Sequence, residues 1–271
     1  MARSSSRNSP TRSLVDRTSF STPGACRRAR WPISGRGSLI DRSGTARWCS
    51  TMSKYKRASG DVIRWPDSPD AREALEEWFA DTSATAYLSG DFLDFRGADL
   101  SRLDLIGAYL ANSHLVGVRF EEANLGDANL SNAELQGADF SFADLAKAEM
   151  VGCSAGKALF RSARLFAVQL DDAVLEGADL RHAILNSAKL YKTDLRGANL
   201  ELASLRWCTL GSTSMPTVLT GARMFGSQFE GAKGAVVGPV LVDEGATRAL
   251  GGAELEAWFS GQGAEHVQVV G

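Results

Sequence analysis

Residues 123–140, ANLGDANLSNAELQGADF, place an apolar residue at every fifth position: Leu125, Leu130, Leu135 and Phe140. On an α-helix a step of five residues turns by about 500°, so these side chains would cover every face of the helix. In a continuous strand they would point alternately to the two sides of the sheet, because five is an odd number. The pattern makes a core only if the chain turns a corner every five residues and returns each apolar side chain to one central axis.

The five-residue cell continues far beyond this stretch. Of the 25 multiples of five from Phe95 to Met215, 24 are Leu, Phe or Met, and Ala155 is the exception. Ala lies two residues before the centre in 16 cells, and the residue between these two inward positions is Asp or Asn in ten cells. Each cell therefore reads as a three-residue β-like bridge and a two-residue corner, and the corner is rich in the Gly, Ser and Asn that turns require.

A second period, of twenty residues, indicates that four corners make one coil. One corner position holds Gly in every fourth cell, with Lys157 as the one substitution: Gly97, Gly117, Gly137, Gly177 and Gly197. We therefore expect an all-β square solenoid of about six coils, each lying on the next at the ~4.8 Å spacing of paired strands. After Met215 the frame slips, so we expect a distorted corner there, followed by cells centred on Met224 and Phe229. The predicted solenoid core includes Leu100, Leu110, Leu125, Leu130, Leu135, Phe140, Leu180 and Leu195.

The unit Ala-(Asp/Asn)-Leu-x-x, as in residues 98–102 and 178–182, resembles the motif of the pentapeptide-repeat family. The resemblance covers residues 91–234 and implies a right-handed quadrilateral β-helix. The cells 151–155 and 166–170 depart from the motif without leaving the register. The resemblance is specific for the fold and says little about function.

Both flanks of the repeat predict a short amphipathic helix, because each carries Leu, Trp and Phe at i, i+3 and i+4. We expect a helix over about 69–80 in the N-terminal flank, 52–90, and another over about 252–260 in the C-terminal flank, 235–271. The ends of a solenoid expose strand edges and core, so these helices are predicted to cap it. The resemblance implies an alternative for the second helix, a seam that joins two subunits into a homodimer. The residues expected to form the two caps, or the seam at the second helix, are Leu75, Trp78, Phe79, Leu255, Trp258 and Phe259.

Residues 1–51 differ from the rest of the chain, with ten Arg, eleven Ser, two acidic residues and no apolar period. Such a segment cannot bury a core. Three interpretations are open: translation starts at Met52 and the segment is a mis-annotated leader, the segment is a disordered tail, or it is a targeting sequence of transit-peptide-like composition.

Charge and motifs argue against most classes of activity. Residues 1–67 carry a net charge of +10 and residues 68–271 a net charge of −12, so the repeat has no basic face for direct binding of nucleic acid. No apolar stretch is long enough for a membrane span. The inward positions of Cys153 and Cys208 lie far apart, so we expect buried, reduced thiols and a cytoplasmic protein.

We expect no enzyme, no cofactor and no metal site. Residues 152–156, GCSAG, match the nucleophile elbow of serine hydrolases, but they stay in solenoid register with Ser154 on a surface bridge. The histidines His114, His182 and His266 have no metal-ligand spacing. The glycines lie singly at corners and form no phosphate-binding loop.

Two functions fit the sequence. The first is a non-enzymatic scaffold whose flat faces bind a protein partner. The second follows from the resemblance: some pentapeptide-repeat proteins mimic duplex DNA, bind DNA gyrase or topoisomerase IV, and protect it from quinolones or toxins. The candidate acidic partner face for this mimicry is Asp99, Asp139, Asp179, Glu121 and Glu122. The arginines Arg119, Arg161, Arg164 and Arg181 interrupt these surfaces, and outward Asp and Asn also serve solubility and corner geometry.

Overall fold

The computed structural model describes residues 57–83, 85–243 and 248–271. The chain divides into two units, Met1–Ser50 and Thr51–Gly271, and the fold below is that of the second unit. The predicted leader, 1–51, and the proposed start at Met52 lie outside the described residues.

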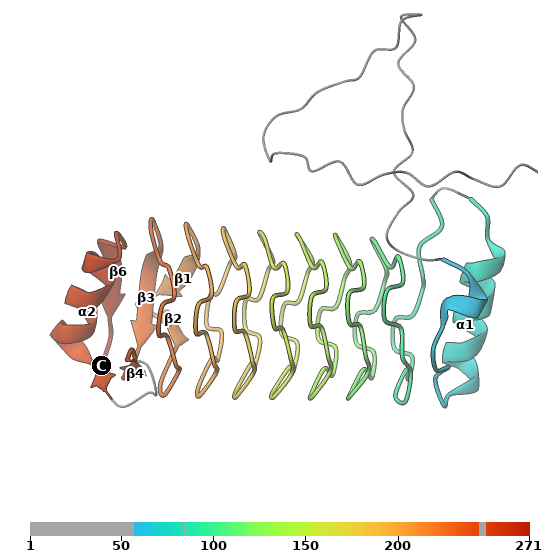
Figure 1. Ribbon diagram of the computed structural model, residues 1–271, viewed down its shortest axis with the longest axis horizontal. Coiled ribbons are helices and arrows are strands. Elements are labelled where there is room, and N and C mark those ends of the chain that lie inside the picture. Colours follow the sequence, from blue (N-terminus) through green and yellow to red (C-terminus); the bar gives the residue numbers. More distant parts are fainter. Residues whose placement is uncertain (1–56, 84, 244–247) are drawn as a thin grey trace, which may run out of the picture. The chain divides into compact units, whose positions relative to one another are not determined.

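The repeat forms a stack of square coils that are twenty residues long (Figure 1). Each side of a coil is a single β-bridge residue that pairs in parallel with the residue twenty positions later, as Asp104 does with Asn124 and Asn124 with Asp144. Neighbouring coils share backbone hydrogen bonds, for example from Asn124 N–H to the Leu103 carbonyl at 2.9 Å. The fold is a quadrilateral β-helix, because every corner returns the chain to the same axis.

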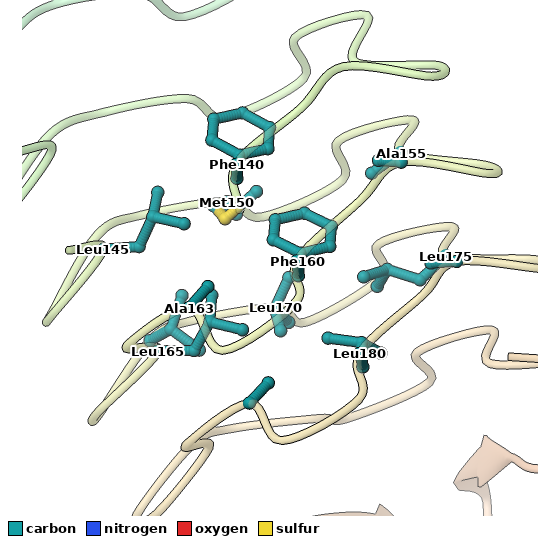
Figure 2. Packing of buried hydrophobic residues seen from close by; sticks show 14 of the residues in the cluster. Phe140, Leu145, Met150, Ala155, Phe160, Ala163, Leu165, Leu170, Leu175 and Leu180 are labelled. Atoms are coloured by element: carbon teal, nitrogen blue, oxygen red, sulfur yellow. The ribbon is translucent and has the colours of Figure 1, made fainter. Parts of the chain in front are cut away.

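The core is the column enclosed by the coils. All eight predicted core residues have an exposed fraction of 0%. Phe120, Phe140 and Phe160 occupy one side in three consecutive coils and stack face to face at 5.0 Å between ring centroids. Figure 2 shows Phe140 and Phe160 one above the other among the leucines of the other sides. Identical inward positions therefore pack as ladders along the stack.

Each corner is a tight turn with two sequence requirements. Its second residue lies in the left-handed region, as in Asn132, with φ of 57°. At nine corners the bridge residue before the corner accepts a hydrogen bond from the backbone N–H two residues later; the distance from Asn129 Oδ1 to Ser131 N, for example, is 2.9 Å. Such Asx turns need a short acceptor side chain, which accounts for the frequent Asp and Asn at this position. The same bond is made by Asp94, Asp99, Asn124, Asp139, Asp144, Asp179, Asp194 and Asn199.

The frame slip near residue 215 is a hairpin insertion. Strands β1 (Thr209–Ser212) and β2 (Met215–Val218) pair antiparallel, and the next bridge joins Asp194 to Val218, twenty-four residues later. Met215 was predicted to be the last regular core centre, but it is 47% exposed, and Leu219 takes its place in the core. The chain inserts four residues here, so the inward position moves from 215 to 219. Met224 and Phe229 are buried as the later cells require.

The N-terminal flank packs on the first coil. After the 3-10 turn η1 (Ser59–Asp61), the chain pairs antiparallel with the stack through Arg64 and Asp99. Helix α1 spans Pro69–Ala80, and its N-cap Ser68 accepts a hydrogen bond from Ala71 N. The buried face of α1 joins the core through Ala71, Leu75 and Trp78.

The C-terminal flank returns to the last coil. Strand β3 (Lys233–Val237) pairs in parallel with β6 (His266–Val269), while β4 (Val240–Leu241) and β5 (Ala249–Leu250) form a small ladder. Helix α2 spans Gly252–Gly261 and buries Leu255 and Phe259. The Phe259 ring lies edge-on to Phe229 at 5.1 Å, so α2 contacts the last core ring.

Candidate interaction surface

The coils present four faces, numbered here by their core centres. Face 1 lies over Leu100, Phe120 and their successors every twenty residues, and faces 2, 3 and 4 lie over the series of Leu105, Leu110 and Phe95. With its two bordering corners, face 2 consists of six segments, which we call coils 1 to 6: residues 101–107, 121–127, 141–147, 161–167, 181–187 and 201–207.

The predicted acidic face lies on face 1, and its first member is wrongly placed. Asp99 was expected to point outward but is 7% exposed, because the segment around Arg64 covers it. Its Oδ1 accepts a hydrogen bond from Ser101 Oγ at 2.6 Å, and Oδ2 lies 3.4 Å from Arg119 Nη1. The sequence did not reveal this burial, because residues 62–64 carry no repeat that would place them on the stack.

Asp179 is half-buried and is neutralised by two arginines. Its Oδ2 lies 2.5 Å from Arg161 Nε and 2.7 Å from Arg181 Nη2. Burial raises the pKa of Asp179, but the hydrogen bonds from Arg181 and Arg161 outweigh burial and lower the pKa to about 2. This carboxylate is therefore ionised at neutral pH and belongs to a cluster with a net charge of +1.

The other three residues of the predicted acidic face also have local partners. Glu121 pairs with Arg119 at 2.9 Å, and Glu122 pairs with Arg102 at 3.3 Å. Asp139 is half-buried and accepts the Asx-turn hydrogen bond from Ser141 N. Face 1 is therefore a mixed surface of alternating charges and not a continuous acidic stripe.

Face 2 carries a group of apolar side chains that sequence reasoning missed. It holds six of the thirteen large apolar side chains that are exposed among the described residues, with exposed fractions from 39% to 56%. They are Ile106, Phe142, Phe166, Ile184, Leu202 and Trp207. The residues do not share one position in the cell, so the five-residue period hides them; aligning the outward positions every twenty residues would have brought them together.

Two of these side chains are held in place by glycines of the following coil. A Cβ atom added to Gly231 would lie 2.3 Å from Trp207 Cδ1, and one added to Gly226 would lie 2.6 Å from Leu202 Cδ2. Both glycines have positive φ, 68° and 66°. The glycines thus leave room for the Trp207 and Leu202 side chains to lie against the following coil.

Charge is unevenly distributed along face 2. Coils 1 and 2 carry one arginine and four acidic residues, a net charge of −3, whereas coils 4 and 5 carry three arginines and no acidic residue, a net charge of +3. Coils 3 and 6 each carry one residue of each sign. Face 2 thus combines apolar side chains with an acidic half and a basic half.

Face 4 has a hollow of about 640 Å³ beside the glycine corners. Its wall includes Ser154, Lys157, Glu176 and Arg196. Arg196 is already paired with Asp194 at 2.6 Å, and its Nη2 lies 3.7 Å from Glu176. The hollow offers one further cation, Lys157, and no buried polar group that points into it.

The serine of the GCSAG stretch and the two described cysteines occupy regular positions of the stack. Ser154 bridges Glu134 and Val174 in the stack, as the solenoid register predicted. Burial raises the pKa of both Cys153 and Cys208 to about 12, so these free thiols stay protonated at neutral pH. Within ranges 57–83, 85–243 and 248–271 there is no cluster of three metal-ligating side chains. No described helix is long and apolar enough to span a membrane.

The predicted cap and seam residues divide by burial. Leu75, Trp78, Leu255 and Phe259 lie in the core of their own chain, so a seam between subunits cannot use them. Phe79 and Trp258 are half-buried and pack at the edge of the core. All six residues therefore pack on their own chain, and both the capping role and the dimer seam stay predictions.

The architecture defines the class of protein: a square β-solenoid that displays fixed side chains on flat faces. The sequence profile of the Pentapeptide repeats family matches residues 93–127, 123–161 and 163–201. The repeat region of this chain belongs to the pentapeptide-repeat family.

Solved structures of the same family resemble this chain at low identity. HetL, a pentapeptide-repeat protein involved in heterocyst differentiation regulation in the cyanobacterium Nostoc sp. strain PCC 7120, is 23% identical over 68% of this chain and 84% of HetL, with a TM-score of 0.35. QnrB1, a plasmid-mediated fluoroquinolone resistance protein, is 21% identical over 66% of this chain and 81% of QnrB1, with a TM-score of 0.41. A protein of the Arabidopsis thaliana thylakoid lumen is 23% identical over 49% of this chain and 72% of its own, with a TM-score of 0.24. No curated protein sequence matches the chain significantly.

Proposed function

We propose that this protein is a non-enzymatic interaction scaffold that binds a polypeptide partner through face 2. The observation that carries the proposal is the group of six exposed apolar side chains on this face. Large apolar side chains gathered on one surface mark sites of interaction with other proteins, among other binding sites. The rigid stack fixes their spacing, so a partner pays little ordering cost on the scaffold side.

The described surface supports a binding role over a catalytic one. Nine Asp and Asn side chains of the stack are engaged in Asx turns, and several carboxylates form ion pairs between coils, such as Asp144 with Arg164 at 2.7 Å. The proposal places the protein in the cytoplasm, where the buried thiols of Cys153 and Cys208 stay reduced.

Site-specific photo-crosslinking in living cells tests the scaffold. A benzophenone side chain at Ile184, on face 2, should form adducts with a polypeptide, and the adducts should disappear when Trp207→Lys is added. The matched control is the same side chain at Gln169, a bridge residue on face 3. Equal adducts at both positions, or none at either, would contradict binding through face 2.

A second candidate function is mimicry of DNA toward a type II topoisomerase such as DNA gyrase. The observation in its favour is the net charge of −12 in residues 68–271. The paired state of Asp179 and the burial of Asp99 count against face 1 as the mimic. We therefore rank this function second.

Supercoiling by purified gyrase, with and without a quinolone, tests the mimicry. If it operates, the protein should compete with duplex DNA, and the competition should weaken as salt rises. Reversing the charge of Asp139, Glu121 and Glu122 together should then abolish it. If supercoiling and quinolone sensitivity stay unchanged at protein concentrations well above that of the enzyme, the topoisomerase function is ruled out.

A further inference from the structure

We infer that the partner of face 2 is a second copy of this chain, packed face to face and antiparallel. This inference rests on the proposed use of face 2 and names its occupant. In such a dimer the two-fold axis lies in the interface and runs across the coils. The axis reverses the order of the coils but keeps each edge of the face against the same edge of the other copy.

The charge distribution selects the antiparallel arrangement. Coils 1 and 2 have a net charge of −3, and coils 4 and 5 have a net charge of +3, or +2 when Asp179 of face 1, which pairs with Arg161 and Arg181, is included. A parallel pair would place the acidic halves together and the basic halves together. An antiparallel pair places each acidic half over the basic half of the other copy, which is the complementarity that favours association.

The equal coil spacing of the two copies then fixes the register. With the axis between coils 3 and 4, coil 1 faces coil 6, coil 2 faces coil 5, and coil 3 faces coil 4. In this register Glu121 lies opposite Arg181, Asp144 lies opposite Arg164, and no two like charges lie at directly opposed positions.

The neighbouring registers fail this test. With the axis on coil 3, Asp144 and Lys147 would each face their own counterparts in the second copy. With the axis on coil 4, Arg161 and Arg164 would do so, and Glu121 would face Glu201. Like charges directly opposed across an interface between two chains are destabilising, so the register between coils 3 and 4 is favoured.

Three of the six apolar side chains fit the same register by size, whereas Leu202 and Ile106 lie opposite Arg102 and Arg206, and Ile184 lies opposite Asn124. Phe142 lies opposite Ser162, and Phe166 lies opposite Ala146, so each large ring meets a small residue. Trp207 lies at the corner opposite Gly107, one residue from Ile106. Large side chains over small ones allow two flat faces to approach to the ~10 Å separation of packed sheets.

Sedimentation velocity of the full chain across a concentration series tests the inference. We expect a reversible dimer with a dissociation constant of roughly micromolar, at the weak end for interfaces of limited area, and weaker association as salt rises. Trp207→Lys should weaken the dimer at least tenfold. Tyr109→Lys, which changes a 49% exposed ring on face 3, should leave it unchanged.

Charge reversal tests the register itself. Glu121→Arg and Arg181→Glu should each abolish dimerisation, because each variant places like charges opposite one another at two symmetric positions. Mixing the two variants should restore a heterodimer, since every opposed pair is then Arg with Glu. Circular dichroism and urea unfolding of each variant show whether it is folded, and a folded pair that fails to associate on mixing contradicts the register.

The two proposals fail separately. A full chain that is monomeric at every concentration overturns the second-copy inference, and so does a dimer that ignores Trp207→Lys. Adducts of Ile184 with a different polypeptide would still support the scaffold in that case. Adducts that form only between two copies of the chain, at twice its mass, support both proposals.

Discussion

The rings of Phe140 and Phe160 lie 5.0 Å apart and within 4° of parallel, although twenty residues separate them in the sequence. The distance matches the spacing of paired strands, so the two rings report the rise of one coil. Equivalent positions of successive coils are therefore neighbours everywhere on the stack, in the core and on its faces.

The stacked rings predict a steep contrast between adjacent outward and inward positions. Phe140→Ala removes a ring with an exposed fraction of 0% and should lower the free energy of unfolding by about 3–5 kcal/mol. The control is Phe142→Ala, which truncates a ring that is 56% exposed and should cost well under 1 kcal/mol. Urea unfolding measures both, and similar costs for the two variants would mean that the register is wrong.

The Asx turns predict that shape matters more than charge at the bridge positions. Asp139 accepts a hydrogen bond from Ser141 N at 2.9 Å, and asparagine keeps that acceptor. Asp139→Asn should therefore be nearly neutral, whereas Asp139→Ala should cost about 1 kcal/mol, as the loss of a hydrogen bond does. Thermal unfolding compares the stability of the two variants. An equal loss of stability in both would indicate that the charge of Asp139, and not its acceptor oxygen, stabilises the corner.

The arginine pair at Asp179 predicts a specific pH dependence. The folded-state pKa of Asp179, about 2, lies below the ordinary value near 3.9. A depressed pKa contributes stability above the unfolded-state pKa, and this contribution is lost as pH falls toward the folded-state pKa. Asp179→Asn should therefore destabilise the protein at pH 7 and have much less effect at pH 2. A difference between the two proteins that is constant over this range would contradict the ion cluster.

The contact between Phe259 and Phe229 predicts that the C-terminal helix protects the end of the stack. Removing residues 253–271 should expose the Phe229 ring and the edge of β3, and the truncated chain should aggregate. Phe259→Ala should cost about 3 kcal/mol or more, because this ring is buried. Light scattering and urea unfolding follow the two effects. A truncated chain that stayed dispersed and equally stable would show that the helix is no cap.

The fold was predictable from the sequence because the five-residue period determines where the corners lie and the twenty-residue period determines the length of a coil. The slip was expected only after Met215, and the period could not show that four residues are inserted earlier, in the hairpin of β1 and β2, so Met215 was wrongly placed in the core. The periodicity also could not place the segment that covers Asp99, because residues 62–64 lie outside the repeat.

The surface was harder to predict than the core. Inward positions have one physical requirement, apolar packing, whereas outward positions serve turns, ion pairs and binding at once. Asp139 and Asp179 share the Gly-Ala-Asp motif, yet only Asp179 is followed two residues later by an arginine, Arg181, and contacts a second one, Arg161, from the preceding coil. The apolar residues of face 2 become a group only when positions twenty residues apart are read as neighbours.

Distances between spin labels in the full chain test the central claim, that face 2 binds a second, antiparallel copy. Labels at Gln169→Cys and Tyr109→Cys, in separate samples, lie on face 3 and outside the interface; Cys26 and Cys49, outside the described residues, are replaced by Ser. In the antiparallel dimer the two copies of the label at position 169 are offset along the stack by one coil, roughly 5 Å. The two copies of the label at position 109 are offset by five coils, roughly 24 Å. Our account predicts a clearly shorter distance for Gln169 than for Tyr109. Equal distances would indicate parallel packing, and the absence of any distance between chains would contradict the dimer.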